Sequence, residues 1–341
     1  DSRHFPEYIF LDRLVEIIWQ RNIRKIEGRI RVECHENPLL PGSWLWEDIS
    51  NYYGAAYFPF NYKDNTYYIG FRTGRDGEKA ELLSIEPEQP GVNFVNEVIA
   101  GTRNTDDAWI YGGPYSQEIH ITGSLPQHQQ LYRVKGAMHH PAQCFLKELE
   151  EQLKLYHIVV EKKALPVTEE QELIVFHSPT LKEIVRITNK KSVNLFAEAL
   201  GSLCMEGNFP SRCCEILHEI NLDTSGILLR DACGLSAVNA IPASVFSNVL
   251  VWAYKELGGD FVASLPLAGT DAALNAYLAA NPALKNRLRA KTGSFTGVRC
   301  LSGYLTRKNG EVLAFTVLVN HFTCSPAQLQ KRIGHFLSTL L

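Results

Sequence analysis

The sequence lacks the features that would assign it to several large protein classes. No apolar run approaches the roughly 18 residues of a membrane-spanning helix, and no signal peptide is visible. The formal net charge of -3 gives no basic face, so nucleic acid is not expected as a partner. There is no CxxC pair and no HExxH spacing, so we predict neither a metal site nor a cofactor.

Cysteine and histidine are present, but their spacing does not indicate chemistry. We interpret the scattered cysteines as small buried hydrophobes, and the sequence leaves open whether any of them pair. The eight are Cys34, Cys144, Cys204, Cys213, Cys214, Cys233, Cys300 and Cys324. The adjacent His139 and His140 are interpreted as a solvated pair in a loop.

The length and composition fit a protein with a sizeable core. The chain has 341 residues, which is comfortable for two domains. Its apolar share of 45% and charged share of 21% are typical of globular proteins. The chain opens on Asp1 without a methionine, so we expect an excised or incomplete product, in which a missing signal peptide carries no weight.

Two changes of pattern divide the chain. Residues 9–22 place apolar side chains at helical spacing, and residues 26–32 alternate like a half-buried strand. From about Tyr52 to Arg133, short alternating or aromatic runs follow one another between turn signals. They are Thr66 to Arg72, Val92 to Ile99 and Glu118 to Thr122. This pattern predicts a small domain rich in β-strands.

Helical periodicity returns after about Ala137. Pro141 is expected to open a helix, because proline is tolerated in the first turn. Further helices are predicted near residues 179–190, 193–205, 211–221, 242–257, 271–280 and 326–341. Val298 to Thr306 and Val312 to Asn320 form a predicted hairpin with an Asn-Gly turn. Its second arm is almost entirely apolar, so we expect a sheet covered by helices to bury both faces of that arm.

Two short motifs carry groups suited to acyl transfer. Lys191-Ser192-Val193-Asn194 stands just before an amphipathic helix, and Lys291-Thr292-Gly293-Ser294 ends a short strand before the hairpin. A lysine ammonium near a substrate carboxylate supplies a point charge, and the Thr292 and Ser294 hydroxyls supply neutral donors. Gly293 has no Cβ, so a substrate backbone could lie against the strand edge like an added strand.

The other groups of the two motifs fit the same chemistry. The Ser294 N–H would be one oxyanion donor. Ser192 could relay a proton to the leaving amine, oriented by Lys291. Asn194 can accept from and donate to the substrate amide at once. Each motif alone also has a plain structural alternative: Ser192 could cap its helix, and Lys-Thr-Gly could be a strand end followed by a turn glycine.

Together, the two motifs resemble part of the signature of penicillin-binding proteins. Residues 190–195 (KKSVNL) are similar to the KKSxN segment of the class C low-molecular-mass penicillin-binding proteins. This is the penicillin-binding protein 4 type, a D-Ala-D-Ala carboxypeptidase/endopeptidase family. Residues 231–236 (DACGLS), 265–271 (LPLAGTD) and 290–297 (AKTGSFTG) resemble further segments of that family. The resemblance runs from about residue 10 to the C-terminus.

The resemblance implies an α+β fold with a serine β-lactamase/transpeptidase-like catalytic domain, whose five-stranded antiparallel sheet lies between helical layers. It implies that residues 1–49 are the remnant of an inserted subdomain, that 50–131 are a mostly β insertion, and that 132–341 are the catalytic domain without its N-terminal part. By position, Asp48 and Tyr53 match insertion residues that reach the amino end of the stem-peptide side chain in relatives. A helix-start carboxylate and a packed aromatic are the alternatives for these two residues.

The resemblance also implies a function. The intact protein would be a periplasmic serine D-Ala-D-Ala carboxypeptidase or endopeptidase, acting on peptidoglycan stem peptides through an acyl-enzyme and trapped by β-lactams. Its catalytic residues would be Ser192, Asn194 and Lys291. Its substrate-binding residues would be Thr292, Gly293, Ser294, Asp48 and Tyr53.

One part of the family signature is absent. No serine is followed three residues later by lysine, so the chain has no nucleophile motif and is predicted to be inactive as it stands. Truncation would explain this, because the family's motif lies before the matching region. The alternative is a non-catalytic peptidoglycan-binding homologue, while a serine β-lactamase is disfavoured by the long insertion before Ser-x-Asn. Ala237 and Thr296 stand where some relatives have an arginine and a glutamine, so the choice between carboxypeptidase and endopeptidase activity stays open. The oligomeric state is open as well.

Overall fold

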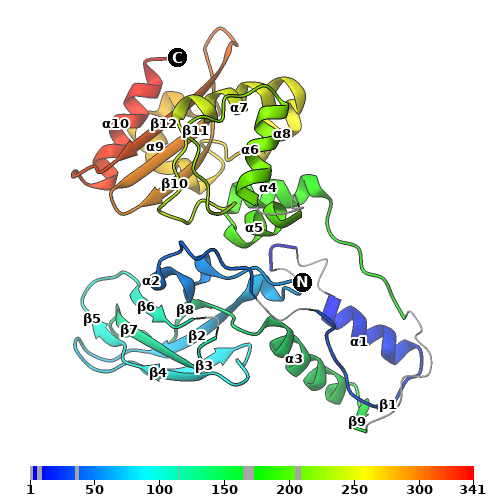
Figure 1. Cartoon of the computed structure of the whole chain (residues 1–341). Helices are drawn as coiled ribbons and strands as arrows, with labels where there is room; N and C mark the ends of the chain where they lie inside the picture. The colour runs from blue at the N-terminus through cyan, green and yellow to red at the C-terminus, as the bar shows by residue number, and fades with distance from the viewer. Residues whose placement is uncertain (1–2, 6–9, 35–37, 114, 164–172, 204–208) are drawn as a thin grey trace. The chain divides into compact units, whose positions relative to one another are not determined.

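The computed structural model describes residues 3–5, 10–34, 38–113, 115–163, 173–203 and 209–341 (Figure 1). The chain divides into two compact units, Asp1–Pro179 (unit 1) and Thr180–Leu341 (unit 2), and each is described by itself. This division differs from the domain boundary expected at residues 131/132. The reason is that the strand Tyr132–Ala137 pairs with a strand of unit 1, and the helix after it contributes to the core of unit 1.

Unit 1 is built from two small sheets, a two-stranded parallel pair formed by β1 and β9, and the helices beside them. The first sheet is antiparallel with the order β3-β2-β8, and the second has the order β4-β7-β5, with β6 also paired to β7. The strands are β1 Lys25–Glu27, β2 Thr66–Arg72, β3 Glu81–Glu86, β4 Asn93–Asn96, β5 Ile99–Gly101, β6 Asp107–Tyr111, β7 Glu118–Pro126, β8 Tyr132–Ala137 and β9 Val159–Glu161. The α-helices are α1 Phe10–Gln20, α2 Trp46–Ile49 and α3 Pro141–Leu155.

The core of unit 1 joins these sheets to α1 and α3. Ile110, Ile119 and Ile121 are fully buried on one face of the second sheet, as the alternating pattern predicts. Proline stands in the first turn of α3, as expected. The strand expected over residues 26–32 is much shorter, because only Lys25–Glu27 finds a partner, the parallel strand β9.

Unit 2 is an antiparallel sheet of consecutive strands between helices. The sheet order is β10-β11-β12, formed by Leu288–Phe295, Val298–Thr306 and Val312–Asn320, so the predicted hairpin is confirmed. The helices are α4 Leu181–Lys191, α5 Asn194–Leu203, α6 Phe209–Glu219, α7 Ala243–Glu256, α8 Gly258–Ser264, α9 Asn275–Ala280 and α10 Pro326–Ser338. The sequence did not predict α8.

Helices cover both faces of this sheet (Figure 1). On one face, Leu288 and Ala290 are buried with Leu329 and Ile333 of α10. On the other, Tyr304 is buried with Leu250 of α7, whose carbonyl accepts the Tyr304 hydroxyl at 2.7 Å. The described residues supply three strands to this sheet, where the resemblance implied five.

The expectation that β12 is buried on both faces is wrong. Of its residues, Phe315 is buried and the others are half-buried or exposed. Within the described residues β12 pairs with β11 alone, so its outer edge is not covered by another strand. Burial of an apolar strand on both faces needs neighbours on both edges as well.

Three further expectations can be compared with the structure. None of the helices within the described ranges is long and apolar enough to cross a membrane. No disulfide joins cysteines of the described part of the chain, in which Cys144 is buried, while Cys204 lies outside it. The expectation of two solvated histidines is wrong for His139. Only 4% of its surface is exposed, because it leads directly into the buried start of α3.

Candidate active site

The Ser-x-Asn motif lies at the junction of α4 and α5. A capping box between Thr180 and Glu183 begins α4, and Lys190 and Lys191 stand in its last turn, where cations favour the helix dipole. Ser192 follows as the C-terminal cap residue, with left-handed backbone angles of φ 55° and ψ 50°. Asn194 then starts α5. Ser192 therefore ends α4 instead of capping α5.

Lys291 meets that hydroxyl from β10. Its ammonium donates to Ser192 Oγ at 2.7 Å and to the Thr292 carbonyl at 2.8 Å. The expected contact between the two motifs is thus present. An ammonium has three donors, and these contacts use two of them. Burial lowers the pKa of Lys291, which means that the ammonium is incompletely solvated and gains from an anionic partner.

The backbone of β10 presents an open edge beside this lysine. The Ala290 N–H donates to the Pro266 carbonyl at 3.0 Å, so Ala290 directs its main chain away from β11. Alternate residues of a strand direct their main-chain groups to the same side. Thr292 and Ser294 therefore direct their N–H groups to the outer edge as well. This is where an oxyanion or an added peptide strand needs donors.

Gly293 is not explained by packing within the chain. A Cβ at this position would meet only the Cβ of Cys300, at 3.6 Å, which is an ordinary contact. Gly293 is exposed and needs no left-handed backbone angle. Glycine in a strand without an internal reason points to close approach by something else, and a substrate backbone is the approach that the motif suggests.

The side chains of the motif lie on two faces of the strand. Lys291 shares one face of β10 with Arg289, whereas Thr292 and Ser294 share the other with the buried Leu288 and Ala290. A ligand that contacts both Lys291 and the two hydroxyls must therefore lie across the strand edge. The sequence did not predict this arrangement.

The sequence did not predict an ion pair that joins the end of α4 to the loop after α8. Lys190 Nζ lies 3.1 Å from Asp271 Oδ2, and both side chains are four-fifths buried. Beside it, the Asn189 amide donates to the Ser264 hydroxyl at 2.8 Å. Asp271 ends the LPLAGTD stretch and Ser264 directly precedes it. The sequence therefore identified this stretch, but not its contacts with α4.

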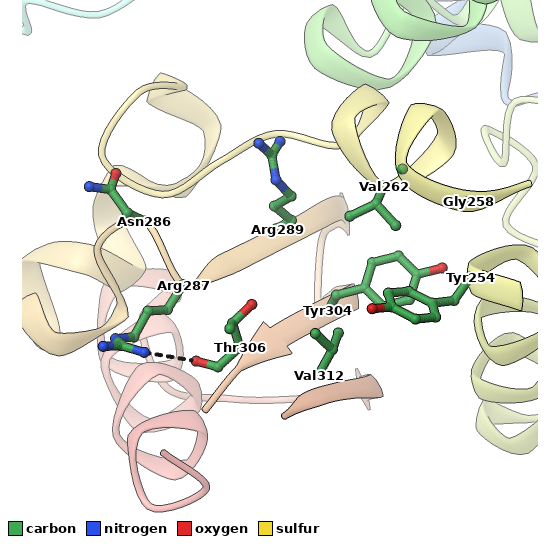
Figure 2. A pocket seen from close by; sticks show the side chains of 10 residues that line it. Tyr254, Gly258, Val262, Asn286, Arg287, Arg289, Tyr304, Thr306 and Val312 are labelled. Atoms are coloured by element: carbon green, nitrogen blue, oxygen red, sulfur yellow. Dashed lines mark hydrogen bonds between the residues drawn. The ribbon is translucent and has the colours of Figure 1, made fainter. Parts of the chain in front are cut away.

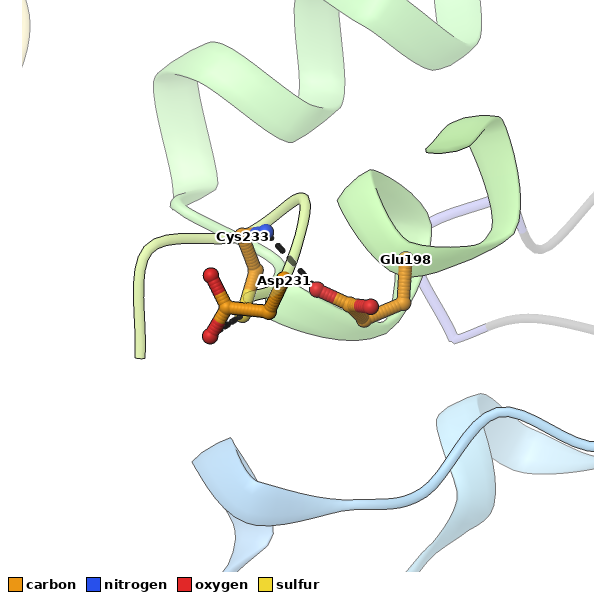
Figure 3. A group of neighbouring side chains, drawn as sticks. All are labelled: Glu198, Asp231 and Cys233. Carbon is orange, nitrogen blue, oxygen red and sulfur yellow. Dashed lines mark hydrogen bonds between the residues drawn. The ribbon is translucent and has the colours of Figure 1, made fainter. Parts of the chain in front are cut away.

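A group of possible metal ligands lies between α5, which carries Glu198, and the loop that carries Asp231 and Cys233 (Figure 3). Glu198, Asp231 and Cys233 are the described residues that could share one ion. The Glu198 carboxylate, however, accepts the N–H groups of Ala232 and Cys233 at 2.9 and 2.7 Å. Burial raises the pKa of the Cys233 thiol, and the nearby Glu198 and Asp231 carboxylates raise it further. We interpret the group as a hydrogen-bonded anchor for the 231–236 loop, because its acceptors already have donors.

A cavity of about 380 Å³ lies in unit 2 between α7, α8 and the start of the sheet (Figure 2). Tyr254, Val262, Arg287, Arg289 and Tyr304 are among the residues that line it. It contains neither Lys291 nor Ser192. The Arg287 guanidinium donates to the Arg307 carbonyl at 3.0 Å, and that of Arg289 to the Leu265 carbonyl at 3.2 Å. These arginines therefore fasten loops to the sheet.

Asp48 and Tyr53 form a local pair within unit 1. Asp48 is buried in α2 and hydrogen-bonds with Tyr53. Burial raises the pKa of Asp48, and the bond from Tyr53 partly offsets that rise. Gly54 makes the close turn possible, since a Cβ there would lie 2.1 Å from the Asp48 carbonyl oxygen. Contact of this pair with a stem peptide stays a prediction.

Comparison with known proteins shows the family of the chain. The model of the D-Ala-D-Ala carboxypeptidase 3 (S13) family matches residues 7–340. The chain belongs to this family. The resemblance to penicillin-binding proteins of this type, stated from the motifs, is therefore confirmed.

Curated relatives are similar over most of the chain. D-alanyl-D-alanine carboxypeptidase DacB of Haemophilus influenzae is 22% identical over 341 residues, covering 89% of this chain and 67% of that protein. Penicillin-sensitive carboxypeptidase A of Dictyostelium discoideum is 25% identical, covering 85% of this chain and 60% of that protein. The D-alanyl-D-alanine carboxypeptidase of Actinomadura sp. is 27% identical, covering 76% and 52%. The chain thus spans between about half and two thirds of the length of these relatives.

Solved structures show the fold. Penicillin-binding protein 4 (dacB) from Haemophilus influenzae superposes with a TM-score of 0.74 at 19% identity, covering 96% of this chain and 79% of that one. The same protein in complex with a β-lactam gives a TM-score of 0.68 at 18% identity, covering 96% and 78%. The predicted α+β fold of the penicillin-binding protein 4 type is confirmed.

Proposed function

We propose that the groove formed by Ser192, Asn194 and the outer edge of β10 binds the D-Ala-D-Ala end of a peptidoglycan stem peptide. The observation that carries the proposal is the contact between Lys291 and Ser192, made beside an open strand edge. A helix cap or a turn glycine does not require this contact. Family membership supports the choice of ligand, because the matching family is one of D-Ala-D-Ala carboxypeptidases.

The chemistry of the groove follows from its donors. The terminal carboxylate of the peptide accepts hydrogen bonds from the third donor of Lys291 and from the Thr292 and Ser294 hydroxyls at the strand edge. Because Lys291 donates to Ser192 Oγ, the serine proton is free to pass to the leaving amine. The Ser294 N–H stabilises the oxyanion, and Asn194 holds the substrate amide.

In the intact protein we propose that this groove serves a serine nucleophile, acting through an acyl-enzyme in the periplasm and trapped by β-lactams. The 341 residues contain no Ser-x-x-Lys, so a non-catalytic peptidoglycan-binding homologue is the second candidate. Sequencing the gene upstream of the Asp1 codon distinguishes the two. An upstream Ser-x-x-Lys favours the enzyme, and an open reading frame without one favours the binding protein.

Calorimetric titration with a peptide ending in D-Ala-D-Ala tests the groove itself. We expect the chain to bind this peptide and Lys291→Ala to weaken binding by at least about tenfold, as for the loss of a charged hydrogen bond. Lys182→Ala is the matched control, because Lys182 is an exposed lysine at the other end of α4. Equal binding by Lys291→Ala and the unchanged chain would contradict the proposal.

A further inference from the structure

The loop after α8 covers part of the outer edge of β10. We call residues Pro266–Ala268 the edge segment. The Ala290 N–H donates to the Pro266 carbonyl at 3.0 Å, and the Ala268 N–H donates to the Leu288 carbonyl at 2.9 Å. Leu267 stands opposite Arg289 in an antiparallel bridge. The outer edge of β10 is therefore engaged at the Leu288 carbonyl and the Ala290 N–H, and a peptide paired with Thr292 and Ser294 meets the edge segment at Ala290.

Positive charge marks the same boundary. Lys291 and Arg289 stand on one face of β10, where the edge segment meets the open edge. Asp271 faces Arg289 and offsets part of its charge, whereas Lys291 has contacts to a hydroxyl and a carbonyl. A peptide that ends here places its carboxylate beside the Lys291 ammonium. A peptide that continues must displace Pro266 and Ala268 from β10.

Asp271 holds the edge segment in this position. Its Oδ2 accepts the Leu267 N–H at 2.9 Å and the Lys190 ammonium at 3.1 Å. Burial raises the pKa of Asp271, but the contacts with Leu267 and Lys190 outweigh this effect and the pKa is lowered. The carboxylate is thus charged at neutral pH. It ties the edge segment to Lys190, which lies two residues before Ser192 on the opposite wall.

The turn between the edge segment and Asp271 requires a glycine. Gly269 has a φ of 95°, which residues with a Cβ rarely adopt, and a Cβ there would lie 2.8 Å from Cγ of Lys285. This turn lets the chain reverse, so that the Asp271 N–H donates back to the Leu267 carbonyl at 2.9 Å. The edge segment is therefore fixed from both its ends, and Asp271 makes the side-chain contact.

We propose that Asp271 is a positioning residue that makes the edge segment a stop, so that the groove accepts a peptide with a free carboxylate beside Lys291 and rejects one whose chain continues. The proposal rests on the proposed function, because it concerns the same groove. It assigns the selection of chain ends to a loop outside both motifs.

Two peptides test the stop in calorimetric titrations. One ends in D-Ala-D-Ala, and the other continues from it by one glycine. We expect the unchanged chain to prefer the first by at least about tenfold, because the second loses the carboxylate contact and meets the edge segment. Asp271→Ala should bring the ratio close to one, and Asp271→Asn, which keeps an acceptor for Leu267, should fall between. Should Asp271→Ala fail to fold, Asp271→Asn carries the comparison.

Asp260→Asn is the matched control. It removes the exposed ion pair of Asp260 with Lys182, 2.8 Å apart, which joins α4 to α8 and does not contact the edge segment. Its peptide ratio should equal that of the unchanged chain. A ratio that fell equally in Asp260→Asn would show that the loss of any ion pair with a lysine of α4 suffices, and would overturn the role of Asp271.

Amide hydrogen exchange gives a readout that needs no peptide. The Ala268 and Ala290 N–H groups should exchange at least about tenfold faster in Asp271→Ala and at the unchanged rate in Asp260→Asn. If the peptide ratio and the exchange rates are both unaltered in Asp271→Ala, the inference is wrong while the proposed function stands. If the unchanged chain binds neither peptide, the proposed function fails and the inference fails with it.

Discussion

Ser192 combines a strained backbone with a functional side chain. Its left-handed conformation costs a residue with a Cβ about 1 kcal/mol, a cost that glycine would avoid. A serine that only ended α4 would therefore be a poor choice. The hydroxyl contact with Lys291 gives a reason for retaining it, which connects the backbone strain to the chemistry of the groove.

We expect Ser192→Gly to separate stability from function. The variant should raise the free energy of unfolding by up to about 1 kcal/mol, because glycine adopts the left-handed turn without strain. It should also weaken binding of the D-Ala-D-Ala peptide as much as Ser192→Ala does. Urea denaturation and calorimetric titration measure the two effects. If Ser192→Gly were the less stable of the two variants, the strain argument would be wrong.

His139 provides a pH dependence in unit 1. Burial, with a smaller contribution from neighbouring His140, lowers the pKa of His139 to about 4. The unfolded chain, with a histidine pKa of about 6.5, then binds more protons than the folded chain between these values. Stability from this group is therefore present above pH 6.5 and is lost as the pH falls towards 4, by about 3 kcal/mol in total.

The measurement is the free energy of unfolding between pH 4 and pH 7. Between pH 7 and pH 4, His139→Gln should lose less stability than the unchanged chain, by a large part of the about 3 kcal/mol attributed to His139. The exposed His120 offers a control, since His120→Gln should keep the slope of the unchanged chain. Parallel slopes for all three proteins would show that His139 does not titrate in this way.

The strands β10 and β11 show how packing and function divide between two glycines. Gly303 lies opposite Ala290, and a Cβ there would stand 2.1 Å from the Arg289 carbonyl oxygen and 2.6 Å from the Ala290 Cα. Gly293 lies opposite Cys300 with room for a Cβ. Packing of the sheet requires the glycine at position 303. Packing does not require the one at position 293, which is consistent with close approach by a ligand.

Alanine substitutions should therefore have opposite effects. Gly303→Ala should destabilise unit 2 by at least about 2 kcal/mol, because the clashing atoms belong to the backbone and cannot turn away. Gly293→Ala should change stability by less than about 1 kcal/mol and still weaken peptide binding. Denaturation and titration of both variants check this pair. Unimpaired binding by Gly293→Ala would remove the strand-addition model of the groove.

The elements that the sequence predicted well are those set by local patterns. The hairpin of β11 and β12, the proline at the start of α3 and the helices α4, α5 and α7 follow from periodicity and turn residues. The pairing of the edge segment with β10 and the bond from Lys190 to Asp271 join residues far apart in the chain. No local pattern encodes such contacts, so the two motifs were found while the stop and its anchor were not.

At the scale of the whole molecule, two separate cores suggest two separate unfolding transitions. Leu153 of α3 is fully buried in the core of unit 1, with Val15 of α1. Leu305 is fully buried in unit 2. We expect differential scanning calorimetry of the chain to resolve two transitions.

Core variants assign the transitions. Leu153→Ala should lower the free energy of unfolding of unit 1 by about 3 kcal/mol and so lower its melting temperature, while the transition of unit 2 stays in place. Gly303→Ala should do the reverse. This comparison also tests the boundary. If Leu153→Ala shifted the same transition as Gly303→Ala, residues 132–155 would belong with the catalytic segment, as the family resemblance implied.

A last prediction concerns covalent chemistry in the chain as a whole. No serine has lysine three residues later, so we expect no stoichiometric mass increase after incubation with a labelled penicillin. Ser192 is a poor substitute nucleophile, since its oxygen accepts a hydrogen bond from the Lys291 ammonium and, among the described residues, has no base there to take its own proton. Intact-mass spectrometry checks this, and an adduct mapped to any serine would overturn the roles assigned above.

The order of the strands also bears on how the chain acquires its structure. In unit 2, β10, β11 and β12 are neighbours in sequence as well as in the sheet, with Thr296-Gly297 joining the first two. In unit 1, β2 must find β8 across residues 73–131. Closing a short loop costs less entropy than closing a long one, and sheets with local pairing form faster. The sheet that carries Lys291 should therefore assemble early, while the strands of unit 1 are still searching for their partners.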